Sequence, residues 1–146
     1  HSIEKCDEVT RKTLRCLFDE LKSIDIYFPG VILKPSMVIS GDTNTHRADY
    51  ETVADMTVNC LKELCPKDLG GIAFLSGGQT NDEATTHLKL MNSGKYELPW
   101  RVTFSYARAI QQSALNAWSG KDENHGEAQS ILGERAKLCS DASIGS

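Results

Sequence analysis

The residue with the clearest capacity for chemistry is Lys34, which ends a short apolar run and is followed at once by Pro35. An ammonium group beside Leu33 and Met37 loses hydration, and this loss favours the neutral amine. A neutral amine can attack a carbonyl carbon and form an imine, so Lys34 is a candidate nucleophile. The octapeptide around it fits an ordinary loop lysine as well, and other segments must decide between the two interpretations.

Two further segments have the composition of a phosphate site, and each follows an apolar run. Residues 75–79 read LSGGQ, and residues 105–108 read SYAR. Glycine-freed backbone amides, a serine hydroxyl and a guanidinium fork suit a phosphate dianion. Taken singly, each segment is better explained as a tight turn or a surface arginine. Their chemistry gains weight only if the fold brings them together with Lys34.

Apolar spacing predicts the elements that must position these segments. Apolar residues recur at helical intervals over residues 6–24, 53–64, 84–91, 110–118 and 123–137. Short apolar runs bounded by glycine or proline predict buried strands at residues 31–33, 72–75 and 102–105. Thr80 and Glu83 have the spacing of a capping box that opens the third helix. Residues 40–45 are expected to form a polar loop.

Several burial predictions follow from the same patterns. The last helix should bury Ala128, Ile131, Leu132 and Ala136. Both tryptophans, Trp100 and Trp118, should pack against the sheet, and Tyr106 should brace the third strand. The four histidines should lie exposed or in loops, because no spacing gathers them around a metal: His1, His46, His87 and His125.

Three strands separated by helices indicate an α/β fold with parallel strands joined by right-handed crossovers. The carboxyl ends of such strands meet at one edge of the sheet, where α/β folds and (β/α)₈ barrels build their active sites. Lys34, Ser76 and Ser105 lie at or just past those ends. No linker or composition change divides the chain, so residues 1–146 are expected to form a single domain.

Composition and motifs argue against several classes of protein. A net charge of −4 and a pI near 5.5 do not suggest a nucleic-acid or membrane-surface binder, and no apolar stretch approaches bilayer length. Five cysteines without C-x-x-C spacing fit reduced thiols in an intracellular protein and no metal site. LSGGQ is also a signature of ABC-transporter nucleotide-binding domains, but the G-x-x-x-x-G-K-[ST] phosphate loop they need does not occur here.

Taken together, three segments resemble class I fructose-1,6-bisphosphate aldolase, the Schiff-base enzyme of glycolysis and gluconeogenesis. They are residues 30–38 (GVILKPSMV), 71–79 (GIAFLSGGQ) and 99–109 (PWRVTFSYARA). Their order and separation also match the family, and Ser36 and Ala107 look most like its plant branch. The resemblance implies a lyase that needs neither metal nor cofactor and acts on a sugar phosphate.

The resemblance also implies individual roles. Lys34 is matched to the lysine whose imine with the substrate ketone withdraws electrons during cleavage of the carbon–carbon bond. The phosphate beside the ketone is matched to five residues: Ser76, Gly77, Ser105, Ala107 and Arg108. Ala107 stands where many members have glycine, so it keeps the backbone amide but loses glycine's backbone freedom.

Family members are a little over twice this length and form a complete barrel. The chain therefore resembles the carboxyl-terminal portion of a (β/α)₈ TIM barrel, about strands six to eight, as one partial barrel domain over residues 1–146. The implied partners are the amino-terminal portion, which carries the proton-transferring glutamates, and the copies of a homotetramer. The implied location is the cytoplasm, with the plastid as the alternative. An inactive fragment, or a module that binds a sugar phosphate without catalysis, remains the alternative function.

Overall fold

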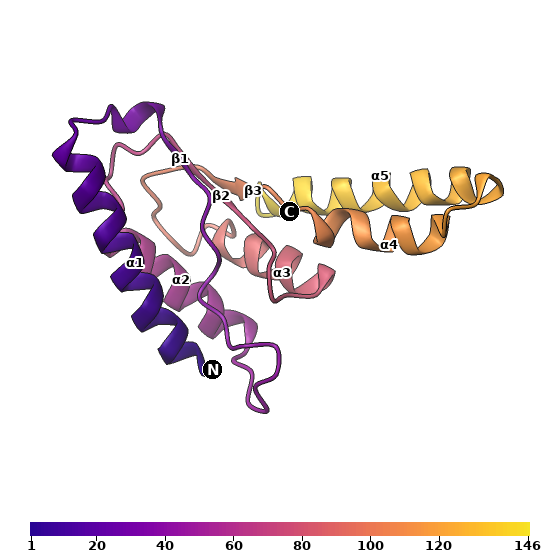
Figure 1. Ribbon diagram of the computed structural model, residues 1–146, viewed down its shortest axis with the longest axis horizontal. Coiled ribbons are helices and arrows are strands. Elements are labelled where there is room, and N and C mark those ends of the chain that lie inside the picture. The colour runs from indigo at the N-terminus through magenta and orange to yellow at the C-terminus, as the bar shows by residue number, and fades with distance from the viewer.

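The computed structural model describes residues 1–146 and has an α/β architecture, with three strands that alternate with helices (Figure 1). Two short 3-10 helices lie at Phe28–Gly30 and Asp122–Asn124. The main elements are α1 (Ile3–Ser23), β1 (Ile32–Leu33), α2 (Tyr50–Leu64), β2 (Gly71–Phe74), α3 (Asn81–Met91), β3 (Val102–Phe104), α4 (Arg108–Trp118) and α5 (His125–Ala142).

The three strands form one parallel sheet in the order β1-β2-β3. The register pairs Leu33 with Ile72, and Ile72 in turn with Val102. Helices α1, α2 and α3 follow one another along the sheet, with α2 in contact with both neighbours. Parallel pairing with a helix in each crossover is the arrangement predicted from the sequence, so the α/β prediction is confirmed.

The starts of α1, α2 and α3 are fixed by side chains that satisfy free backbone N–H groups of the first turn. The Ser2 and Asp49 side chains accept hydrogen bonds from the first turns of α1 and α2. Thr80 and Glu83 form the predicted capping box at α3: the Thr80 hydroxyl accepts from Glu83 N, and the Glu83 carboxylate accepts from Thr80 N at 2.7 Å. The loop that follows β2 therefore passes into α3 at a defined residue.

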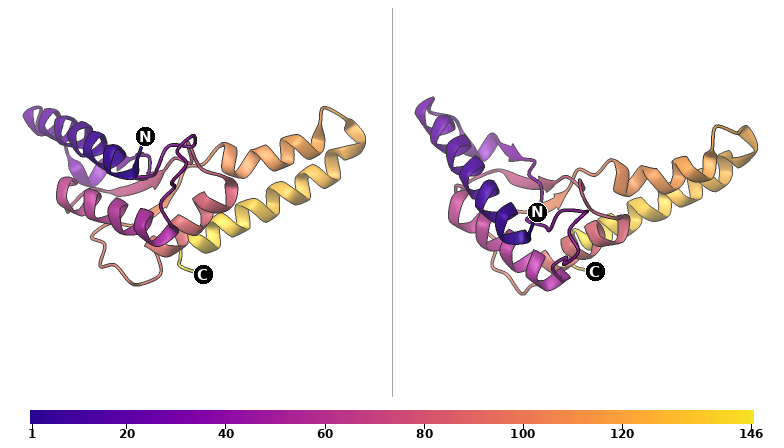
Figure 2. Two further views of the ribbon diagram at one scale, coloured as in Figure 1. Left: turned by 90° about the horizontal axis from the view of Figure 1, so that it is seen from below. Right: turned by 60° about the horizontal axis from the view of Figure 1, so that its bottom comes forward.

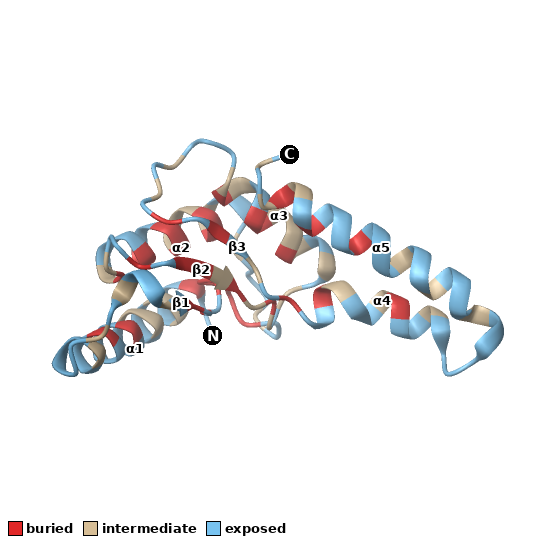
Figure 3. Ribbon diagram, turned by 90° about the horizontal axis from the view of Figure 1, so that it is seen from above, coloured by how far each residue is buried: buried red, intermediate tan, exposed pale blue.

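One face of the sheet carries the core, and the other is open. Leu33, Ile72, Phe74 and Val102 are buried, whereas Ile32 is 62% exposed. Successive residues of a strand point to opposite faces, so Ile32 belongs to the face that no helix of this chain covers. The prediction of a fully buried first strand was therefore wrong for Ile32. Figure 3 shows buried residues concentrated in the strands and in the helices beside them.

Helices α4 and α5 form a hairpin that extends away from the sheet (Figures 1 and 2). The two helices pack mainly on each other, and α5 also contacts α3 near the base of the hairpin. A two-helix contact needs only one narrow stripe per helix, so Leu132, Ala136 and Trp118 are exposed. The predictions that these three residues are buried were wrong. None of the helices combines the length and apolarity needed to cross a bilayer.

Candidate functional site

The carboxyl ends of the three strands are joined side by side by backbone hydrogen bonds that continue beyond the strands. Leu75 N donates to Pro35 O at 3.0 Å, and Ser105 N donates to Phe74 O at 2.8 Å. Residues next to Lys34, Ser76 and Ser105 are thus in direct contact across neighbouring strands. The fold brings the three predicted segments to one edge of the sheet, as parallel strands require.

Lys34 is exposed, although Leu33, Pro35 and Met37 around it are buried. The alternation that exposes Ile32 also directs Lys34 to the open face of the sheet. The expectation that its apolar neighbours in the sequence would desolvate the amine was wrong, because those neighbours point to the other face. Four residues after the lysine, Val38 N donates to the buried Thr57 hydroxyl at 3.0 Å and fixes the chain after Pro35 against α2.

The glycine segment forms a tight turn just beyond β2. Ser76 is buried, and Gln79 N donates to Ser76 O at 3.3 Å to close the turn. Gly78 has a φ of +74°, and a Cβ there would lie 3.0 Å from Ile39 Cδ1. The left-handed backbone favours glycine at this position, and a Cβ would in addition force the Ile39 side chain to shift by a few tenths of an ångström. Gly77 and Gly78 contribute no side chains of their own to the turn.

The third segment leads into the amino-terminal end of α4. Ser105, Ala107 and Arg108 are exposed, and no side chain caps the helix. Uncapped N–H groups and the helix dipole favour an anion at this end. Ala107 has a negative φ of −103°, so this position does not require glycine.

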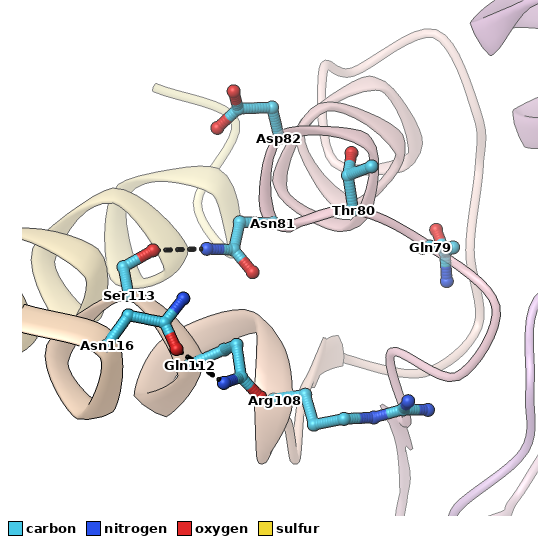
Figure 4. Close-up of a pocket in the computed structure, with 8 residues that line it drawn as sticks. All are labelled: Gln79, Thr80, Asn81, Asp82, Arg108, Gln112, Ser113 and Asn116. Atoms are coloured by element: carbon cyan, nitrogen blue, oxygen red, sulfur yellow. Dashed lines mark hydrogen bonds between the residues drawn. The ribbon is translucent and has the colours of Figure 1, made fainter. Parts of the chain in front are cut away.

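Arg108 also lines a polar cavity of about 500 Å³ between the starts of α3 and α4. In Figure 4 its side chain extends from α4 toward the side on which Gln79 lies, while Asn81 and Ser113 hydrogen-bond at 2.8 Å across the cavity. Amide and hydroxyl groups, the Arg108 guanidinium and the Asp82 carboxylate form this lining, and no hydrophobic residue does. The arrangement suits a polar ligand and does not suit an apolar one.

His87, which sequence reasoning did not assign to the site, contacts the end of the glycine turn from α3. His87, expected to be exposed or in a loop, is instead on α3 and only 2% exposed, so that prediction was wrong. Burial lowers the pKa of His87 to about 4. Its Nδ1 donates to Gln79 Oε1 at 2.7 Å. The signal was available in the sequence, since His87 lies three residues after Ala84 on the predicted inner face of the helix.

Tyr106 lies just past β3 and is tied to α3, in line with its predicted bracing role. The residue is buried, and its hydroxyl donates to Ala84 O at 2.8 Å. Burial raises the pKa of the Tyr106 phenol above its usual range. Tyr106 therefore links the third segment to α3 and is not placed to act on a ligand in solution. Trp100 is buried too and donates Nε1–H to Pro66 O at 2.7 Å.

Comparison with known proteins gives the same family that the three motifs suggested. The family model of class I fructose-bisphosphate aldolase matches residues 1–146, the whole chain. The chain belongs to this family. The probable class 1 aldolase of Xanthomonas campestris is 50% identical over 99% of this chain and 43% of its own length. The cytosolic aldolase 4 of Arabidopsis thaliana is 41% identical over 99% of this chain and 37% of its own.

A solved aldolase has the same fold over the matched part. The aldolase of Plasmodium falciparum, crystallised with TRAP and a small-molecule inhibitor, superposes with a TM-score of 0.92 at 42% identity. That match covers 99% of this chain and 42% of the crystallised one. The chain thus spans about two fifths of the length of the aldolases it matches, and its three strands correspond to part of their barrel.

Proposed function

We propose that the natural polypeptide carrying these residues is a fructose-bisphosphate aldolase. It cleaves fructose 1,6-bisphosphate reversibly to dihydroxyacetone phosphate and glyceraldehyde 3-phosphate. The observation that carries this proposal is the hydrogen bond from Leu75 N to Pro35 O, 3.0 Å long, in a chain of the aldolase family. It sets Lys34 beside the glycine turn, so that one substrate can meet an amine and a phosphate site together.

Lys34 is the proposed nucleophile. Its Nζ attacks the C2 carbonyl of the ketose, and loss of water gives an imine, which is protonated to an iminium. A base outside these residues removes the proton of the C4 hydroxyl, and the C3–C4 bond breaks. Its electron pair moves to the iminium nitrogen and leaves an enamine, while the triose aldehyde departs. Protonation of the enamine at C3 and addition of water then release dihydroxyacetone phosphate and free Lys34.

The phosphate beside the ketone is proposed to rest between the two loops that follow β2 and β3. Its ligands there are the Ser76 hydroxyl, the Gly77 and Ala107 amides, Ser105 and the Arg108 guanidinium. Phosphate oxygens suit an uncapped helix start and a guanidinium fork. Anchoring the phosphate holds the ketone carbon against Lys34, which turns a chance encounter into a positioned attack.

The chain spans only about two fifths of its relatives, so further parts are proposed to complete the enzyme. Residues 1–146 are proposed to be one partial TIM-barrel domain. The remaining strands of the barrel would cover the open face of the sheet, desolvate Lys34 and supply the base. A homotetramer is the proposed assembly, and the cytosol is the proposed compartment, with the plastid as the alternative.

The cleavage proposal is tested by assaying fructose 1,6-bisphosphate cleavage in that polypeptide and in its Lys34→Ala variant. Activity should disappear in the variant, since no other group replaces the imine nitrogen. Lys62→Ala is the matched control, because Lys62 is an exposed lysine in the last turn of α2. Equal activity in Lys34→Ala and in the control contradicts the mechanism.

A second candidate function is sugar-phosphate binding without cleavage. It is favoured by the exposure of Lys34 in this chain, because no buried pocket encloses the side chain that would have to act as the nucleophile. Titration with dihydroxyacetone phosphate, using Arg108→Ala as the comparison, tests it together with the cleavage assay. Binding that Arg108→Ala weakens, without cleavage, supports this second function. Absence of binding in both proteins removes it.

A further inference from the structure

The glycine turn after β2 is held on the side of the helices by an arginine from a different loop. Arg47 lies in the polar segment that follows β1 and Lys34. Its guanidinium donates to Gly78 O at 3.2 Å and pairs with the Glu83 carboxylate at 3.1 Å. Glu83 also accepts from Thr80 N, where α3 begins. The Arg47 side chain thus joins the segment after β1 to Gly78 in the turn and to Glu83 in the first turn of α3.

A second contact holds the next residue of the turn. His87 on α3 donates Nδ1–H to Gln79 Oε1 at 2.7 Å, and the edge of its ring meets Tyr50 on α2, with centroids 5.2 Å apart. His87 Nε2 and Gln79 Nε2 are both buried, and neither atom has a hydrogen-bond partner. Buried polar groups without partners are costly, so the single bond between Gln79 and His87 confines the Gln79 side chain.

We propose that Arg47 is a positioning residue that, through Gly78 and Glu83, holds the phosphate-binding turn in register with Lys34. The His87–Gln79 pair is the second anchor of the same turn. The inference rests on the proposed function, since it assumes that the turn binds a substrate phosphate. Two ties run between the segment after β1 and the turn: Pro35 O to Leu75 N at its near end, and Arg47 to Gly78 O at its far end.

Direct contact of Arg47 with the phosphate is the competing explanation, and Glu83 distinguishes the two. The guanidinium is already shared between a carbonyl and a carboxylate, and the Glu83 side chain is only 18% exposed. If Arg47 bound phosphate directly, the Glu83 charge would repel the anion, and removing that charge would tighten binding. If Arg47 works as an anchor, the same change releases Arg47 and weakens binding.

The test measures borohydride trapping of ketones in the natural polypeptide that carries these residues. The variants are Arg47→Met and Glu83→Gln, each assayed with dihydroxyacetone phosphate and with unphosphorylated dihydroxyacetone. Glu83→Gln keeps a side-chain oxygen for Thr80 N–H, so the capping box survives. Arg15→Met is the matched control, because Arg15 is an exposed arginine on α1 that pairs with Glu63 at 3.5 Å.

Both variants should need about tenfold more dihydroxyacetone phosphate for half-maximal trapping, equal to about 1.4 kcal/mol. Trapping of dihydroxyacetone should stay unchanged, because it uses Lys34 and no phosphate. Tighter binding of the phosphorylated ketone in Glu83→Gln overturns the inference in favour of direct contact. Unchanged trapping in both variants, with a wild type that traps the phosphorylated ketone, overturns the inference alone. A wild type that traps neither ketone overturns the proposed function and the inference together.

Discussion

Replacement of Arg135 by leucine is expected to destabilise the protein more than loss of a surface ion pair can explain. Arg135 lies on α5 and is buried, and its guanidinium joins the starts of α3 and α4. Nε donates to Ala109 O at 3.2 Å, and one Nη donates to Asn81 O at 2.8 Å. Another Nη pairs with Asp82 at 3.1 Å, but that carboxylate is 88% exposed.

The contacts of Arg135 set the expected size of the effect. Arg135→Leu removes two hydrogen bonds from a charged donor to backbone carbonyls, although Asn81 O keeps the Thr85 hydroxyl as a donor, and each bond to a charged group contributes about 1.5–3 kcal/mol. The free energy of unfolding should therefore fall by about 3 kcal/mol, a value that allows for partial entry of water. Asp82→Asn removes only the exposed ion pair and should cost less than about 1 kcal/mol.

Urea denaturation of the two variants and the wild type measures these changes from the midpoints and slopes of the transitions. A fall in the free energy of unfolding of less than about 1 kcal/mol in Arg135→Leu would refute the proposal that Arg135 holds the starts of α3 and α4 together. An equal loss in Asp82→Asn would show that the ion pair, and not the carbonyl contacts, holds the helix starts together. Arg135→Lys serves as a further comparison, because a single ammonium cannot reach both carbonyls in the same geometry.

Three other predictions concern stability and thiol reactivity. Below pH 6.5 the unfolded His87 binds a proton that the folded residue, with its pKa near 4, does not bind. The free energy of unfolding should therefore fall by about 3 kcal/mol between pH 7 and pH 4 through His87. Urea denaturation measures this fall, and an equal dependence of the free energy of unfolding on pH in His87→Asn would contradict it. Thr80→Ala should lower the free energy of unfolding by about 1 kcal/mol through loss of the α3 cap, while Thr86→Ala inside the helix should not lower it. Equal losses in the two variants would refute the stabilising role of the cap. A thiol reagent at pH 8 should label exposed Cys16 long before buried Cys65, whose pKa burial raises to about 12; mapping an early adduct on Cys65 would contradict the fold.

Local signals in the sequence predicted the elements and the edge of the sheet at which the candidate site lies. Thr80 and Glu83 are three residues apart and form the expected capping box, because that motif depends only on neighbours along the helix. Lys34, Ser76 and Ser105 were placed together because parallel strands must align their carboxyl ends. These inferences needed only chain order and strand direction, and both follow from apolar spacing and turn residues.

Contacts between distant residues were not predictable in the same way. Arg47 meets Gly78 and Glu83 across more than thirty positions, and Arg135 meets Asn81 across 54. The sequence around a basic residue in a polar stretch, or on a helix with few apolar residues, does not indicate which distant residue it will contact. Leu132 and Trp118 failed for a related reason: helical spacing predicts which face is apolar, but not whether another element covers it.

The open face of the sheet links these errors to the proposed function. Ile32 and Lys34 are exposed, and the chain spans only about two fifths of the matched aldolase. The uncovered face and the sheet edges predict association with additional barrel strands. Lys34 is thus placed by this chain, while its desolvation is proposed to come from those strands.

The most direct test of the central claim is borohydride trapping with dihydroxyacetone phosphate, followed by intact-mass measurement and peptide mapping. It is applied to the natural polypeptide that contains these residues, with a known class I aldolase treated in parallel. The account predicts a single adduct on Lys34 that Arg108→Ala weakens. No adduct, or an adduct on a different lysine while the known aldolase labels normally, would contradict the claim that Lys34 and the glycine turn form one site.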